Sequence, residues 1–439
     1  MGRAEGSCFE RYSPRSVTDQ NRSHADVLGV NGVVQRYSAA VKRATAWVLL
    51  GSVSGLLAGV SSFVFLSVLD RITDVRGEHG WSVYLLPVAG LGLGIAYHRV
   101  GGRAAQGKAL IIEQIHEPNG WVPRRMAPMV LLGTWVTHLF GGSAGREGTA
   151  VQLSAGLTDT VARHLPITAA DRRVLLQASV AGGFGAVFGV PIAGTVFALE
   201  VPTVGRMHTG ALVPALCASV VGNQVVSLLG YRHALLPRLA INVSAQTTFR
   251  VVVAALLFGF TGAAFSSISQ YLRDTLAKHV QWPPLLPALG GLGVTLLAVL
   301  FGRSYLGLSV PLATASLAGA HVAIWVFALK LVFTAITFGS GLPGGEVTPL
   351  FVIGATLGAA LGPVLGMSSS SLAALGFIAV FAAASKTPLA CTVMGLELFG
   401  TASAVPIAIA CVIAFVASGR TGIYKTQRWS EQTANRVIG

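Results

Sequence analysis

The amino-acid sequence predicts an all-α, polytopic membrane protein composed of two related halves, and three observations support that fold class. Of its 439 residues, 53% are hydrophobic and 11% are charged, whereas a soluble domain carries about a quarter charged residues. Apolar stretches of membrane-spanning length recur without an alternating strand pattern, which favours helices over a barrel. Two motifs of the first half also return in the second half.

Six apolar stretches have, alone or with their flanks, close to the roughly 20 residues that a helix needs to cross hydrocarbon. They are Ala46–Leu69, Met126–Phe140, Ala211–Leu229, Val251–Ile268, Leu285–Phe301 and Ala402–Ala417. We divide the chain into a first transmembrane repeat over residues 41–230, a connecting loop over 231–245 and a second transmembrane repeat over 246–428.

Polar, basic segments flank the two repeats. Residues 1–40 contain no apolar signal-peptide core and are expected to form a cytoplasmic tail, because Lys42 and Arg43 directly precede the first span. The basic C-terminus, with a tail over 429–439, is placed on the same side. The net charge of +14 is spread over loops, which indicates topology and attraction to the lipid bilayer, so no nucleic acid partner is expected.

The cysteines and histidines predict neither a disulfide framework nor a metal site. Cys8 lies in the polar tail, the other three cysteines lie in apolar segments, and no CxxC pair occurs. The ten histidines are scattered, without cysteines or carboxylates at ligand spacing. We therefore expect no metal and no cofactor.

An internal repeat is visible in two long motifs. "GFGAVFGVPIAGTVFALE" (Gly183–Glu200) and "GFIAVFAAASKTPLACTVMGLE" (Gly376–Glu397) share G-F-x-A-V-F followed by P-[IL]-A-x-T-V-x-x-L-E. Their final glutamates are 397 − 200 = 197 residues apart. The shorter motifs around Glu147 and Glu346 are 346 − 147 = 199 residues apart. A repeat of this period is typical of transporters whose substrate site lies between two related halves, parallel or inverted.

Glycine-rich turns open directly into apolar helices in both halves. "GGSAGREGT" and "FGSGLPGGEVTP" each leave backbone N–H groups free at a helix start, where the helix dipole adds partial positive charge. Such a start binds anions without a cationic side chain. "FGVP" and "ASKTP" repeat the pattern with proline near the first turn. We expect these four helix starts to converge on one anion site.

Glu147 lies at the mouth of this expected site. A carboxylate at membrane depth costs about 2.5–3.5 kcal/mol on insertion scales, which favours a functional role. The ionised side chain would occupy the anion site, and protonation would release it, so that Glu147 would act as a plug that carries a proton. Arg146 would reduce the cost as a local charge partner. The alternative is an acid in the first turn of a helix on a cytoplasmic loop, favoured by the dipole alone.

These motifs resemble the CLC family of anion channels and proton-coupled antiporters over about residues 45–425. The resemblance rests on "GSAGREGTAVQ" and on the helix motif that ends at Glu200. It implies a homodimer with one anion pathway per subunit, each subunit an inverted repeat of short, tilted and broken helices. It also implies that Glu147 is the external gating glutamate and that the protein lies in a bacterial inner membrane with both termini cytoplasmic.

Several positions depart from the chloride-transporting members. The loop that usually offers a serine to chloride reads "GKAL", so that either Lys108 or Ala109 takes the place of the serine. Val347 stands where a phenylalanine is usual, and Val201 replaces the internal proton-relay glutamate. These changes resemble the bacterial fluoride/proton antiporters of the family. In that branch, residues matching Glu346 and Thr348 belong to the fluoride pathway.

The resemblance therefore implies a set of site residues. Glu147 is expected to gate the pathway and transfer the proton. The expected anion-binding residues are Lys108, Ala109, Arg146, Gly148, Thr149, Glu346, Val347, Thr348 and Tyr424. An aromatic contact to the anion from the segment after the loop is not expected, because that segment carries three isoleucines.

The sequence is thus interpreted as a proton-coupled antiporter that exports fluoride in exchange for protons. Fluoride accepts hydrogen bonds far better than chloride, and a carboxyl and a threonine hydroxyl are suitable donors for it. A chloride transporter or chloride channel of the same fold is the alternative. No enzymatic activity is expected, because Ser143, His138 and His164 lie in no G-x-S-x-G-type arrangement. A scaffold without transport would not need two mirrored anion-type loops.

Overall fold

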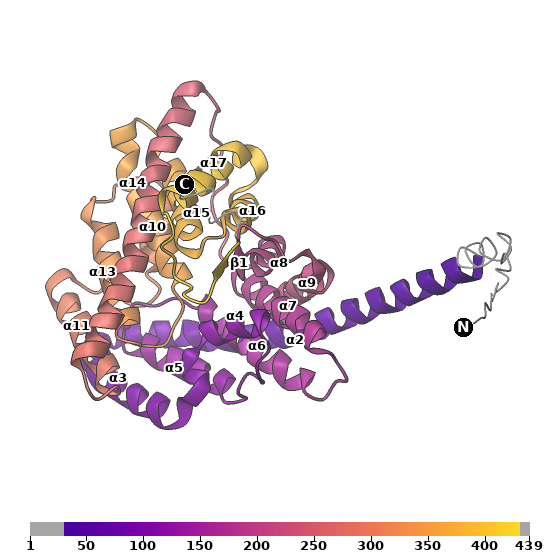
Figure 1. The fold of residues 1–439 in the computed structure, drawn as a ribbon. Helices are drawn as coiled ribbons and strands as arrows, with labels where there is room; N and C mark the ends of the chain where they lie inside the picture. Colours follow the sequence, from indigo (N-terminus) through magenta and orange to yellow (C-terminus); the bar gives the residue numbers. More distant parts are fainter. Residues whose placement is uncertain (1–29, 431–439) are drawn as a thin grey trace, which may run out of the picture. The chain divides into compact units, whose positions relative to one another are not determined.

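The computed structural model describes residues 30–430 and is almost entirely helical (Figure 1). Its contacts divide the chain into a unit that ends at Val48 and a unit that begins at Leu49, and the site lies in the second unit. Helix α2 covers Val30–Glu78 and therefore includes the last residues of the segment interpreted as a tail. The remainder of that tail and the end of the C-terminal tail lie outside the described residues.

Two series of helices follow one another in the same order. The first series continues after α2 with α3 (Leu86–Ala96), α4 (Lys108–His116), α5 (Met126–Leu139), α6 (Glu147–Ala162), α7 (Ala169–Phe188), α8 (Pro191–Glu200) and α9 (Leu212–Leu228). The second series comprises α10 (Ala245–His279), α11 (Leu285–Phe301), α12 (Val310–Leu317), α13 (Trp325–Gly339), α14 (Val347–Leu365), α15 (Ser369–Ser385), α16 (Pro388–Phe399) and α17 (Ala404–Ala417). Strands β1 (Thr203–Val204) and β2 (Arg428–Trp429) pair in parallel.

Few of these helices are long enough to cross a membrane. Among the described residues, five helical segments reach the required length and hydropathy, namely Gln35–Glu78, Gly80–His116, Thr209–Leu228, Ala245–His279 and Val347–Leu365. Other apolar helices have only 10–17 residues. Short helices leave their ends inside the protein, where backbone N–H groups need partners. The prediction of a helical membrane protein with short and broken helices is confirmed.

The two halves pack into each other. Helix α3 of the first half lies against α11 of the second, and α8 lies against α16 (Figure 1). Helices α14 and α15 approach so closely that a Cβ atom at Gly354 would lie 1.9 Å from the carbonyl oxygen of Gly376. Small residues permit such close packing of backbones, which is the main source of helix association in lipid.

Two glutamates each cap a helix of the other half. The Glu397 carboxylate at the end of α16 accepts hydrogen bonds from the backbone N of Ile192 and Ala193 in α8, at 2.9 and 2.7 Å. The Glu200 carboxylate at the end of α8 accepts the corresponding bonds in α16, from Leu389 at 3.1 Å and from the next residue at 2.7 Å. This exchange is the contact pattern of an approximate two-fold axis between α8 and α16.

The expectation that four helix starts converge on one anion site is therefore wrong for α8 and α16. Both starts are already occupied by carboxylates of the protein. A glutamate reaches each start because the matching helices lie side by side around the two-fold axis. Only the glycine-rich starts of α6 and α14 remain for the anion.

A buried ion pair fixes the helix that carries Lys108. The Arg172 guanidinium on α7 donates two hydrogen bonds to Asp159 on α6, at 2.6 and 3.0 Å, and one to Gln114 on α4 at 3.2 Å. Asp159 also accepts the backbone N of Val122 at 2.7 Å. Because each charge is paired and hydrogen-bonded, the network holds α4, α6 and α7 in register.

Replacement of Glu200 with alanine is expected to lower the free energy of unfolding by about 2–4 kcal/mol, because a buried backbone N–H without a partner costs about 1–3 kcal/mol. Glu397→Ala removes the same pair of bonds at a less buried position, so we expect a smaller loss of about 1–2 kcal/mol. Thermal denaturation in detergent measures both. A shift no larger than that of Glu78→Ala, an exposed control at the end of α2, would contradict the capping role.

Candidate anion site

The two remaining glycine-rich turns meet at the centre of the second unit. Gly145, before α6, and Gly345, before α14, form an isolated antiparallel bridge. The backbone N of each donates to the carbonyl oxygen of the other, at 2.5 and 2.9 Å. The starts of α6 and α14, one from each half, are thereby joined across the two-fold axis.

The Glu147 side chain, the first of α6, lies on the start of α14. One carboxylate oxygen accepts the backbone N of Val347 and, at 3.1 Å, that of Thr348. The other accepts the Thr348 hydroxyl at 2.8 Å and the backbone N of Arg146 at 2.9 Å. We call these four donors the carboxylate cradle. Glu147 is only 1% exposed, so it is not an acid on a solvated loop.

The cradle requires glycine on both sides. A Cβ atom at Gly345 would lie 2.5 Å from a Glu147 carboxylate oxygen, and one at Gly145 would lie 2.7 Å from the same oxygen. The same two Cβ atoms would also lie 2.7 Å from the backbone N of Gly148 and 2.8 Å from the carbonyl oxygen of Gly345, respectively, and these backbone atoms cannot move aside as a side chain can. The glycines of "SAGREG" and "GGEVTP" therefore allow two backbones and one carboxylate to share a space that larger residues would fill.

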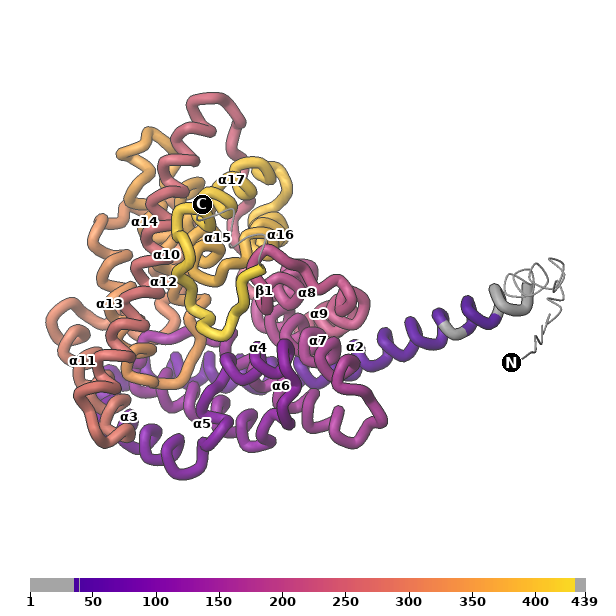
Figure 2. Tube along the Cα trace, in the orientation of Figure 1, coloured from indigo at the N-terminus to yellow at the C-terminus, as the bar shows by residue number. Residues whose placement is uncertain are grey.

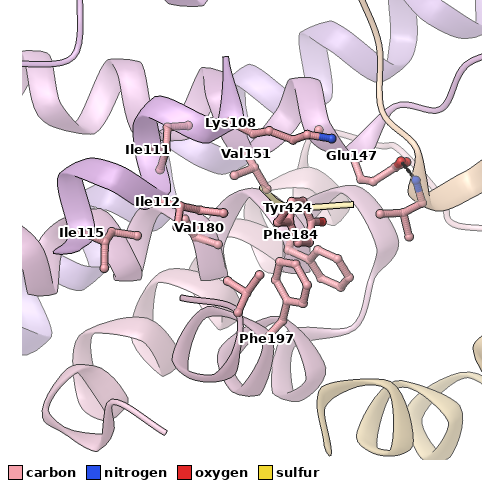
Figure 3. Close-up of a pocket in the computed structure, with 13 residues that line it drawn as sticks. Lys108, Ile111, Ile112, Ile115, Glu147, Val151, Val180, Phe184, Phe197 and Tyr424 are labelled. Carbon is pink, nitrogen blue, oxygen red and sulfur yellow. Dashed lines mark hydrogen bonds between the residues drawn. The ribbon is translucent and has the colours of Figure 1, made fainter. Parts of the chain in front are cut away.

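A small cavity adjoins Glu147, and we call it the glutamate cavity. Its volume is about 30 Å³, enough for about two water-sized occupants. It is lined by Lys108, Ile111, Ile112, Ile115, Glu147, Gly148, Val151, Val180, Phe184, Phe197, Val201, Val347 and Tyr424. In Figure 3, Lys108 and Glu147 lie toward one end and Ile115 at the other. Polar groups are few, so an ion that enters must shed most of its water.

Lys108 and Ala109, the two candidates for the place of the chloride-binding serine, lie in different surroundings. The Lys108 side chain lines the glutamate cavity, forms an ion pair with Glu346, and lies 5.2 Å from the centre of the Tyr424 ring. Ala109 does not border this cavity; its carbonyl oxygen accepts the Thr426 hydroxyl. Of the two candidates, only Lys108 therefore has its side chain at the glutamate cavity.

The segment after α17 turns back to pair with β1 (Figure 2), and its Tyr424 lines the glutamate cavity (Figure 3). The backbone N of Ile423 donates to the carbonyl of Ala384 at 2.9 Å, and the Gln427 amide donates to the carbonyl of Val201 at 2.9 Å. Farther on, Arg428 donates to Glu117 in the loop after α4, which holds the pKa of that exposed carboxyl below its usual value. These bonds fix the tyrosine ring between the two halves.

Most of the residues predicted for the site lie together. Lys108, Glu147, Gly148, Val347 and Tyr424 border the glutamate cavity, and Thr348 belongs to the carboxylate cradle. Glu346 is 8% exposed, pairs with Lys108, and faces a separate polar cavity of about 320 Å³ that Lys108 also borders.

Thr149 is not brought to the site. It follows Glu147 by two residues, about 200° around the helix, and its hydroxyl forms a hydrogen bond of 2.6 Å with Thr134 on α5. Arg146 does not pair with Glu147 through its charge, because its guanidinium donates to the Tyr231 hydroxyl at 3.2 Å. It contributes to the cradle through its backbone N–H.

Lys330, which no sequence motif marks, is a buried cation that positions the turn before Glu147. Its ammonium group donates to the Ser143 and Ser309 hydroxyls, both at 2.9 Å, and to the carbonyls of Tyr305 and Gly307 at 3.1 and 2.8 Å. It therefore links α13 of the second half to the "GGSAGREG" turn of the first half. A single charge in the apolar run "FALKLVF" was the available signal.

The phenylalanine rings that line the glutamate cavity come from a part of the chain that was not expected to contribute to the site. Phe184 on α7 and Phe197 on α8 line the glutamate cavity and stack at 4.3 Å between ring centres. They belong to the repeated motif that was interpreted as a helix signature. Ile111, Ile112 and Ile115 on α4 form the facing wall. Among the described residues, no cluster of three or more His, Cys, Asp or Glu side chains could hold a metal ion.

Comparisons with known proteins agree with this arrangement. Residues 89–419 match the family model described as voltage gated chloride channel. A chloride/fluoride channel protein of Pseudomonas syringae pv. tomato is 43% identical over 401 residues, which cover 89% of this chain and 88% of that protein.

Two solved structures share the fold. The crystal structure of a CLC-type fluoride/proton antiporter has a TM-score of 0.85 at 34% identity, over 88% of this chain and 98% of the other. A slow cyanobacterial Cl⁻/H⁺ antiporter has a TM-score of 0.74 at 20% identity, over 86% and 96%. The chain therefore belongs to the CLC family, is similar to a fluoride/proton antiporter of that family, and is a helical membrane protein that transports anions.

Proposed function

We propose that the protein is a proton-coupled antiporter that exports fluoride in exchange for protons, with Glu147 as its protonatable gate. The observation that carries this proposal is the carboxylate cradle. Backbone N–H groups at a helix start form an anion site, and here the occupant is a carboxylate of the protein itself. Glu147 therefore stands in for the transported anion.

Protonation would change this balance. The ionised carboxylate accepts four hydrogen bonds from the cradle. A protonated carboxyl is neutral and attracts the dipole of α14 and the N–H donors less strongly. It would leave the cradle, and an anion would take its place. Release of the proton would return the carboxylate and displace the anion, so that anion and proton movement are coupled at one side chain.

The surroundings of the cradle favour fluoride. Lys108 supplies an ammonium donor where chloride transporters of the family offer a serine, and Thr348 supplies a hydroxyl within the cradle. The glutamate cavity is small and mostly apolar. A small, strongly accepting ion recovers more of its hydration energy from a few strong donors than a large ion does. Selectivity would arise from these donors together with the limited space.

Glu346 is proposed as the second proton carrier. The relay position of chloride antiporters is Val201 here, which lines the glutamate cavity and cannot titrate. Glu346 lies next to the cradle, pairs with Lys108, and borders the polar cavity of about 320 Å³. A carboxyl at this position can exchange a proton with water in the polar cavity and with the gate. Because Glu346 pairs with Lys108, protonation of Glu346 would leave the Lys108 charge without its partner and make the site more positive.

A chloride transporter or chloride channel remains the competing function, and the name of the Pseudomonas relative includes both ions and the word channel. The likeness to the cyanobacterial chloride antiporter extends to the fold alone. We further propose that the protein acts as a homodimer in the bacterial inner membrane, with both termini cytoplasmic.

The function is tested by efflux of fluoride and chloride from liposomes, with proton uptake recorded in the same assay. We expect fluoride efflux to drive proton uptake and to exceed chloride efflux. In Glu147→Gln, which keeps the shape of the side chain but cannot carry a proton, proton uptake should vanish. Equal rates for the two ions would refute the fluoride assignment, and fluoride efflux without proton movement would refute antiport.

A second prediction concerns Glu346. We expect Glu346→Gln to lower fluoride efflux by roughly tenfold or more, since a bond to a charged partner contributes about 1.5–3 kcal/mol, and to abolish proton coupling. Glu113→Gln, at an exposed position on α4, is the matched control and should retain both activities. Retention of proton coupling in folded Glu346→Gln would contradict the proposed relay.

A further inference from the structure

A second cavity lies on the other side of the carboxylate cradle. It has a volume of about 100 Å³ and is bordered by Arg146 and Thr348. The next residues in the chain to these two, Glu147 and Val347, border the glutamate cavity instead. We call it the arginine cavity. The cradle, with Glu147 in it, therefore separates two cavities, and the arginine cavity reaches the protein surface near the exposed Thr314.

The loop between α9 and α10 contributes His233 to this cavity. Both ring nitrogens of His233 are shielded from solvent, and neither makes a hydrogen bond of normal geometry with the described residues, although the ring has a weaker contact with the backbone carbonyl of Ala186. The Nε of Arg146 is also buried without a partner. Unpaired buried polar atoms are rare in native proteins and call for an explanation. Here three of them belong to two side chains that border the same space.

The histidine ring is held in place mainly by packing, with the contact to the Ala186 carbonyl beside it. Its Cδ2 atom would lie 2.7 Å from a Cβ atom at Gly189, which ends α7 with φ +73°. The ring of Tyr231 packs edge-on against it, with 5.4 Å between ring centres. The absence of a side chain at Gly189 thus provides the space for the imidazole. A ring fixed in this way, with its nitrogens unpaired, is preorganised for a ligand.

The groups that border the cavity select an anion. The Arg146 guanidinium is a permanent cation, and one of its terminal nitrogens is bound to the Tyr231 hydroxyl, which leaves Nε–H as a donor. The imidazole supplies at least one further N–H. The other lining residues are apolar apart from Thr314 and Thr348, and none of the described lining residues is acidic. The exposed Asp70 bonds to the Tyr231 hydroxyl and also interacts with the Arg146 charge, but it does not border the cavity.

We propose that the arginine cavity is a second anion-binding site, in which a small, partly hydrated anion is held between Arg146 and His233 while Glu147 occupies the cradle. The volume is enough for an ion and a few water molecules. An ion at this site lies next to Thr348 and enters the cradle when Glu147 leaves it. This inference rests on the proposed function, because the ligand of the site is the anion that the protein transports.

The site is located directly by anomalous diffraction from crystals of the full-length protein soaked in bromide. We expect an anomalous peak within hydrogen-bonding distance of Arg146 Nε and a His233 ring nitrogen in the wild type, and its loss in His233→Ala. Water alone in the cavity of the wild type would overturn the proposal. The arginine cavity, unlike the smaller glutamate cavity, has room for bromide, so this result does not depend on whether fluoride or chloride is the native substrate.

Flux measurements test the role of the site. We expect His233→Ala to raise the anion concentration at half-maximal efflux by about three- to tenfold, as for the loss of one hydrogen bond, with little change in the maximal rate. His233→Gln keeps an N–H donor and should restore most of the affinity. His321→Ala, at an exposed position, is the matched control. An unchanged half-maximal concentration in His233→Ala would contradict the second anion site, even if coupled fluoride transport is established. Loss of proton coupling without a change in this concentration would likewise contradict the site.

Discussion

The binding of the Glu147 carboxylate to the start of α14 is the interaction on which the site depends. It joins the first residue of α6, in one half, to the first turn of α14, the matching helix in the other half. The glycine bridge beneath it, the buried Lys330 and the ion pair of Arg172 all hold the two turns in place for this contact. Removal of any of these supports would move the donors relative to the carboxylate.

The same chemistry occurs elsewhere in the molecule as a fixed contact. Glu200 and Glu397 also bind helix starts of the opposite half, each through two backbone N–H groups. A carboxylate on a helix start is therefore a means by which the repeat satisfies the ends of its short helices inside the membrane. At Glu147 this contact is combined with a cavity on either side of the cradle. In the proposed mechanism, the carboxylate can therefore leave the cradle, and an anion can bind in a neighbouring cavity before it enters.

Much of this arrangement could be predicted from the sequence because glycine density and the internal repeat mark it. The glycine-rich turns before Glu147 and Val347 stand out in the sequence, and the structure joins them at one place, with Tyr424 at the adjoining glutamate cavity. The hydroxyl of Thr149 was misplaced because a motif does not reveal the rotation of its helix. The capping by Glu200 and Glu397, and the approach of His233 to Arg146, depend on contacts between distant segments. No local pattern encodes those contacts.

The central claim is that Glu147 and the transported anion compete for one set of donors. Calorimetric titration of the purified protein with fluoride, repeated in buffers of different ionisation enthalpy, measures this competition directly. The account predicts that fluoride binding to the wild type takes up a proton. It also predicts that Glu147→Ala, with its cradle empty, binds fluoride more tightly and without proton uptake. Equal affinity in the two proteins, with no proton taken up by either, would contradict it.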